Sequence, residues 1–154
     1  MAILVVRLRG TVNVPYWAVT TLKNLYLNKK FSATLVPETS EYLGMLRKIS
    51  QWVAWSKADR EIVKTLIENR AKNKNPRSDS LRKTGNNKDY KGIDELVDVL
   101  VNDKIKFSEQ NNVRPWFSLN PPKGGFKKST KRQFSDGGTL GSNKDLLEIV
   151  KKMI

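Results

Sequence analysis

The sequence contains no cysteine and no histidine in 154 residues. The absence of cysteine excludes a disulfide framework and a zinc finger, and it fits a reducing compartment. Without these two residue types the chain lacks the commonest general base, the commonest metal ligand and the thiolate nucleophile. We therefore predict that the protein is not an enzyme and that it holds neither a metal ion nor another cofactor.

Long hydrophobic runs are also missing. The longest apolar run near the start covers residues 2–6, whereas a membrane span needs roughly 18 to 20 residues. The first residues also lack the basic leader and the cleavage site of a signal peptide. We expect a soluble, cytoplasmic protein with no membrane partner and no small-molecule substrate.

Acidic residues are scarce relative to basic ones, since 29 Lys+Arg face 15 Asp+Glu and give a net charge of +14. Half of this surplus lies in residues 104–132, which carry eight basic side chains and one acid. Phenylalanine, tryptophan and a Gly124-Gly125 pair are interleaved with them. Lysines neutralise phosphates, glycines let a backbone approach them closely, and aromatic rings stack on unpaired bases. The pattern predicts a nucleic-acid partner, and folded RNA in particular.

Two features of the basic segments leave alternatives open. Trp116 and Phe117 could stack on bases, but the interpretation that we favour is that they anchor the core. Residues 64–91 carry nine basic side chains against three acids. Most of these lie in a polar loop over 72–91 that is either an RNA contact or a solvated connection.

The first 58 residues predict a β-α-β-α-β core. We expect strands over 3–6, 31–36 and 52–55, where β-branched or alternating apolar residues recur. Pro15 begins a helix that closes at Lys29-Lys30, and Thr39 or Ser40 caps a second helix. The predicted fold class is α/β (α+β), and the core is a small two-layer sandwich with both helices on one sheet face.

Residues 59–154 predict a helical, loop-rich extension packed on that core. Apolar spacing indicates helices over 59–72 and 93–101. Late prolines and glycines predict little regular structure over 104–141. Ser142 and Asp145 have the spacing of a capping box that starts a last helix.

Several motifs occur in an order that is similar to a known family. They are ILVVRLRG at 3–10, LVPET at 35–39, GMLRK at 44–48, VAWSKAD at 53–59, NPPKGGF at 120–126 and GGTLGS at 137–142, before LLEIVKKMI. Together they resemble large-ribosomal-subunit protein thirty, called protein seven in eukaryotes, in its archaeal form. The resemblance covers essentially the whole chain, and GMLRK looks like the part shared with the short bacterial form.

The resemblance implies a structural ribosomal protein that binds large-subunit rRNA, near the 5S rRNA and beside other ribosomal proteins. By position it implies roles for Arg47, Lys48 and Lys123, and Lys123 stands where the family often has arginine. Charge and composition add further candidates in both basic segments. The predicted RNA-binding residues are Arg47, Lys48, Arg77, Arg82, Lys83, Arg114, Lys123, Lys127, Lys128, Lys131 and Arg132.

Two rival functions can be stated from the same residues. A free nucleic-acid-binding regulator would need a basic reading helix, and the helix over 59–72 is the one candidate, although it carries Glu61 and Glu68. An enzyme would need a desolvated lysine or carboxylate in a concave pocket, and no spacing indicates one.

Overall fold

The computed structural model describes residues 1–71, 93–102, 106–109 and 114–154. The strands are β1 (Ile3–Arg7), β2 (Ser32–Val36), β3 (Val53–Lys57), β4 (Phe117–Ser118), β5 (Ser129–Gln133) and β6 (Gly138–Ser142). They form one mixed sheet in the order β4-β2-β1-β3-β6-β5. The α-helices are α1 (Tyr16–Asn24), α2 (Ser40–Lys48), α3 (Arg60–Arg70), α4 (Ile93–Val101) and α5 (Leu146–Lys151). The predicted α/β class and the β-α-β-α-β order of the core are therefore confirmed.

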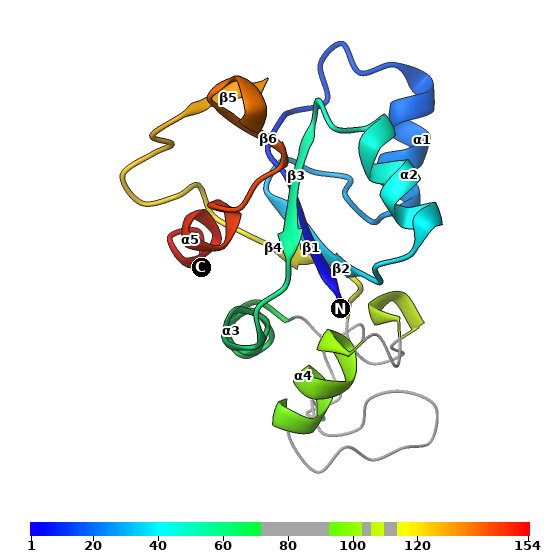
Figure 1. The fold of residues 1–154 in the computed structure, drawn as a ribbon, viewed down its shortest axis with the longest axis vertical. Helices are drawn as coiled ribbons and strands as arrows, with labels where there is room; N and C mark the ends of the chain where they lie inside the picture. Colours follow the sequence, from blue (N-terminus) through cyan, green and yellow to red (C-terminus); the bar gives the residue numbers. More distant parts are fainter. Residues whose placement is uncertain (72–92, 103–105, 110–113) are drawn as a thin grey trace.

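Strand β1 lies in the middle of the sheet and is buried on both faces. It pairs antiparallel with β2 and with β3. Ile3 and Val5 pack with the residues of α1 and α2, whereas Leu4 and Val6 pack with those of α3, α4 and α5. A strand covered on both faces needs apolar residues at every position, which explains the unbroken run. Figure 1 shows α1 and α2 together on one side of the sheet and α3 and α5 on the other.

The extension contributes strands as well as helices, so the prediction of little regular structure over 104–141 is wrong. β4 pairs antiparallel with β2 at one edge of the core sheet. At the other edge β6 pairs parallel with β3, and β5 pairs with β6. The sequence of β5, STKRQ, carries no apolar alternation. Its extended conformation is fixed by pairing with β6 rather than by its own propensity.

The predicted end of the first helix at Lys29-Lys30 is also wrong. Helix α1 ends at Asn24, and Tyr26 adopts a left-handed conformation with φ of 58°. The Leu27 amide then donates to the Leu22 carbonyl at 2.8 Å, which closes the helix in the manner of a Schellman motif.

Of the two predicted side-chain caps, one is confirmed and one is wrong. The Thr39 hydroxyl accepts from the Tyr42 amide at 3.5 Å, so the predicted cap of α2 is confirmed. The Ser142 capping box is wrong, because α5 begins after Asp145, which makes no side-chain cap hydrogen bond. Instead the Asn143 side-chain oxygen accepts from the Asp145 amide at 2.8 Å. Asn143 therefore shapes the turn before α5.

Helices α3 and α4 are joined by apolar packing and by two ion pairs. Arg60 Nε lies 2.7 Å from Asp98 Oδ1, and Lys64 Nζ lies 2.7 Å from Asp94 Oδ1. The hydrogen bond from Lys64 lowers the pKa of Asp94 below its ordinary value of 3.8, and the same bond raises the pKa of Lys64.

The longest described helix is α3, with 11 residues. Across the described ranges, no helix combines the length and apolarity that crossing a bilayer requires.

Candidate nucleic-acid interface

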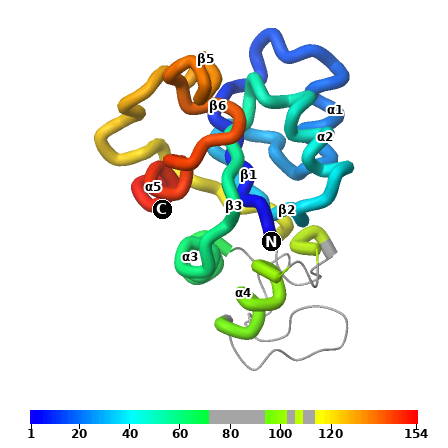
Figure 2. The backbone as a smooth tube through the Cα atoms, viewed as in Figure 1, coloured from blue at the N-terminus to red at the C-terminus, as the bar shows by residue number. Residues whose placement is uncertain are grey.

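Five of the predicted cations lie along one edge of the molecule. Lys131 and Arg132 are on the edge strand β5, and Lys123, Lys127 and Lys128 are in the segment that leads into it. All five side chains are solvent-exposed. We call these five residues the basic strip. Figure 2 shows the segment before β5 as an amber bend beside the red C-terminal helix.

Backbone contacts with the C-terminus hold the basic strip in place. The Asn120 amide donates to the Met153 carbonyl and the Lys123 amide to the Lys152 carbonyl, both at 3.1 Å. Between them and β5, Gly124 and Gly125 have φ of 81° and 73°, and the Gly125 amide donates to the Pro122 carbonyl at 2.9 Å. Residues with a Cβ atom rarely adopt such left-handed φ angles, which explains why glycine occupies both positions.

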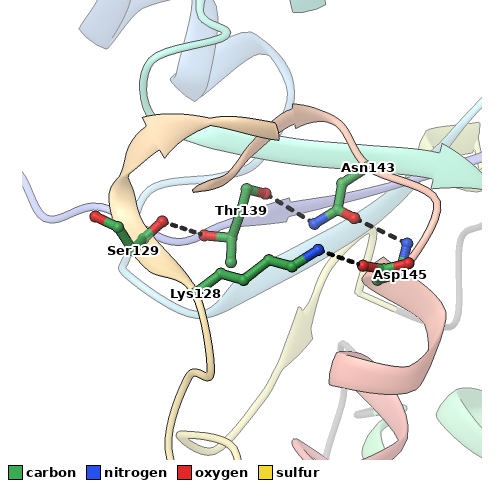
Figure 3. A network of polar contacts seen from close by, with 5 residues as sticks. All are labelled: Lys128, Ser129, Thr139, Asn143 and Asp145. Carbon is green, nitrogen blue, oxygen red and sulfur yellow. Dashed lines mark hydrogen bonds and ion pairs between the residues drawn. The ribbon is translucent and has the colours of Figure 1, made fainter. Parts of the chain in front are cut away.

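A buried polar network fixes the strand next to the strip (Figure 3). The Thr139 hydroxyl donates to the Ser129 carbonyl at 3.3 Å, and the Asn143 amide group donates to the Thr139 carbonyl at 3.0 Å. Thr139 and Asn143 are each 1% exposed. At the surface Lys128 Nζ pairs with Asp145 Oδ2 at 2.8 Å. Lys128 is therefore partly neutralised, and no ion pair of the other four strip cations occurs in the described residues.

Arg47 and Lys48 reach the same end of the sheet as β5. They form the last turn of α2 and are both exposed. The Gln133 side chain, at the end of β5, donates to the Ser50 carbonyl at 3.2 Å. This hydrogen bond joins two segments that are far apart in the sequence, and it brings the GMLRK motif toward the strip.

Arg114 lies elsewhere. It precedes β4, which forms the opposite edge of the sheet from β5. Its guanidinium lies 5.9 Å from the Trp116 ring centroid.

Phe117 is fully buried and stacks on Phe107 at 5.0 Å, whereas Trp116 is half-buried. The core-anchor interpretation is thus confirmed for Phe117. Three predicted candidates, Arg77, Arg82 and Lys83, lie outside the described residues.

Other residues near these cations were not predicted from the sequence. Lys151 ends α5 and Lys152 follows it, and the Lys152 carbonyl accepts from the Lys123 amide of the strip at 3.1 Å. A basic pair at the end of a predicted helix could have indicated them. The sequence also contains no acid before Glu38. At the start of α1, Lys48 Nζ lies 5.4 Å from the Trp17 ring centroid.

The fold and the basic strip define a small, strongly cationic α/β protein suited to a polyanionic partner. The profile of the family "Ribosomal protein L30p/L7e" matches residues 3–53. The "Large ribosomal subunit protein uL30" of Cenarchaeum symbiosum (strain A) is 40% identical over 153 residues, which cover 99% of this chain and 98% of the relative. The same-named proteins of Nitrosopumilus maritimus (strain SCM1) and Korarchaeum cryptofilum (strain OPF8) are 40% and 37% identical, covering 99% of this chain and 98% and 94% of theirs. The chain belongs to the uL30 family of large-ribosomal-subunit proteins.

Proposed function

We propose that the protein is a structural constituent of the large ribosomal subunit, that it binds large-subunit rRNA through the basic strip, and that it catalyses no reaction. The observation that carries the proposal is the clustering of Lys123, Lys127, Lys128, Lys131 and Arg132 along one edge of the fold. Membership of the uL30 family supports it, because its relatives are named as large-subunit proteins.

The mechanism is electrostatic. Four of the five strip cations have no ion-pair partner in the described residues, so their charge is available to phosphates. Each phosphate contact releases condensed counterions, and this release drives binding. Arg47 and Lys48 extend the contact across the end of the sheet, while Arg114 contacts RNA from the opposite edge. Arg77, Arg82 and Lys83 remain predicted contacts.

We also propose where the protein acts and which molecules surround it. In the ribosome of the cytoplasm it contacts neighbouring ribosomal proteins, and the 5S rRNA lies near it. It recognises neither a membrane nor a small-molecule substrate.

The test is sedimentation of the tagged full-length protein with large subunits through a gradient of moderate salt. We expect the parent protein to co-sediment with the large subunit, and the variant with all five strip cations changed to Gln to remain near the top. A matched control is R60Q/K64Q, since these cations are already paired with Asp98 and Asp94. Free parent protein at the top of the gradient would contradict the proposal.

The free regulator remains the alternative, and the structure of α3 weakens it. Ile62, Val63, Leu66 and Ile67 of α3 are buried in the core. On its exposed side Arg60 and Lys64 pair with the acids of α4. A helix in this state offers few cations to a DNA groove. A labelled duplex that bound more tightly than rRNA fragments in one assay would favour the regulator.

A further inference from the structure

The first turn of α1 exposes two aromatic rings that the fold does not need to bury. Tyr16 is 86% exposed and Trp17 is 44% exposed, whereas Ala18, Thr21 and Leu22 form the buried face of the helix. We infer that Tyr16 and Trp17 form a stacking surface for unpaired bases of large-subunit rRNA, with Lys48 and Arg47 placed for the adjoining phosphates. This inference rests on the proposed function and adds a contact that does not depend on the basic strip.

The two rings cover adjoining directions at the helix start, because consecutive helical residues point about 100° apart. Trp17 is held by neighbours on its inner side. Its ring meets the buried Trp52 edge-on, with centroids 5.9 Å apart and an interplanar angle of 79°. Lys48 Nζ lies 5.4 Å from the Trp17 ring centroid. An aromatic ring ordered before binding loses little conformational entropy when a base stacks on it.

The surrounding charge favours a nucleotide over the apolar surface of another protein. Neither residues 1–37 nor residues 42–58 contain an aspartate or a glutamate. The one acid of α2, Glu41, is in its first turn, at the other end of the helix from Lys48. An exposed ring beside the Lys48 ammonium, on segments that carry no acid, matches the two parts of a nucleotide, its base and its phosphate.

The backbone before α1 is also fixed. The Arg7 guanidinium donates to the Arg9 and Gly10 carbonyls, each at 2.9 Å, and Arg9 Nη1 donates to the Gln51 carbonyl at 3.2 Å. The Gln133–Ser50 hydrogen bond lies one residue from Gln51 in the chain. An RNA strand following the basic strip would therefore arrive at the end of the sheet where Tyr16 and Trp17 lie.

The experiment measures the affinity of the full-length protein for protein-free large-subunit rRNA. The informative series is Y16F, Y16L and Y16A, since Tyr16 is almost fully exposed and its replacement should leave the melting temperature unchanged. Y16F keeps the ring and should bind like the parent. Y16L and Y16A should weaken binding by roughly 5- to 150-fold, the range measured for loss of one stacked base. V12A, at an equally exposed aliphatic position, is the matched control.

A second readout locates the contact directly. Photocrosslinking with 4-thiouridine-substituted rRNA should mark the tryptic peptide 10–23, which contains both rings. If Y16L and Y16A bound rRNA as tightly as the parent and the peptide gave no crosslink, the inference would be wrong. The proposed function would still stand if binding of the parent protein depended steeply on salt. Unchanged rRNA affinity with reduced incorporation into subunits would assign the surface to a protein partner and overturn it as well. A parent protein that failed to bind rRNA would refute both proposals.

Discussion

Arg7 is a buried cation that is held by carbonyl groups instead of a carboxylate. The residue is 2% exposed and is the last one of the central strand β1. Its guanidinium donates to the carbonyls of Arg9, Gly10, Leu27 and Asn28 at 2.8 to 3.1 Å. Burial lowers the pKa of the Arg7 guanidinium. The planar guanidinium can donate to four carbonyls at once. It therefore links residues 9–10, before α1, to residues 27–28, after α1, and fixes both segments.

We predict that R7M lowers the free energy of unfolding by about 2 to 4 kcal/mol, because one buried and three partly buried carbonyls lose their donor at once. Guanidinium chloride denaturation followed by far-ultraviolet circular dichroism measures the change. R9M is the matched control, since Arg9 is half-buried and makes one exposed hydrogen bond to Gln51. It should cost no more than about 1 kcal/mol. Equal stability of R7M and the parent would show that the four hydrogen bonds contribute nothing net.

Tyr26 shows why the end of α1 could not be predicted. Leu22 and Leu25 keep helical spacing, and nothing after them resembles the usual glycine stop. The helix nevertheless ends because Tyr26 takes a left-handed conformation. Leu25 and Leu27 are then both buried. Tertiary packing overrides a local preference here, and a single sequence does not contain that information.

Strands β5 and β6 approach each other unusually closely at Gly138. A Cβ atom added at Gly138 would overlap the backbone carbonyl of Arg132, so a side chain there forces the two strands apart. By contrast, Gly44 in α2 has no atom within 4 Å of an added Cβ. The close approach of the strands therefore requires glycine at position 138, whereas position 44 has room for a side chain.

We predict that G138A destabilises the protein by about 1 to 3 kcal/mol, the usual cost of forcing an extra methyl group into a packed site. It should also weaken rRNA binding, because β5 carries Lys131 and Arg132. G44A should instead stabilise the protein by about 1 kcal/mol, since alanine is the better helix former. Thermal unfolding of both variants checks this contrast. A G138A protein as stable as G44A would contradict the close approach.

The core elements could be predicted because their residues alternate between apolar and polar or recur at helical spacing. The strands β4, β5 and β6 could not, since β4 has two residues, β5 is polar and β6 carries two glycines. β4 and β6 become strands by joining the two edges that the core leaves open, and β5 becomes one by pairing with β6.

Charge counting found the candidate cations but not their arrangement. The sequence grouped Arg114 with Lys131 in one basic segment, yet β4 and β5 form opposite edges of the sheet. It separated Arg47 from Lys131, yet Gln133 and Ser50 join their segments. Side-chain proximity of this kind depends on the strand order, which composition does not determine.

The net charge of +14 is divided between structural and available cations. Arg7 is buried, and Arg60 and Lys64 are paired with α4. The basic strip and the end of α2 remain exposed, near one end of the sheet. The proposed function requires that the available cations, rather than the total charge, determine RNA affinity.

The most direct test of this requirement is the salt dependence of binding to large-subunit rRNA. The logarithm of the binding constant falls linearly with the logarithm of salt concentration, with a slope of about −0.7 to −0.9 per phosphate neutralised. We predict a steep slope for the parent protein and a slope that is shallower by roughly 3 to 5 when Lys123, Lys127, Lys128, Lys131 and Arg132 are all changed to Gln. R60Q/K64Q should keep the parent slope. A five-fold variant with the affinity and slope of the parent would contradict the account.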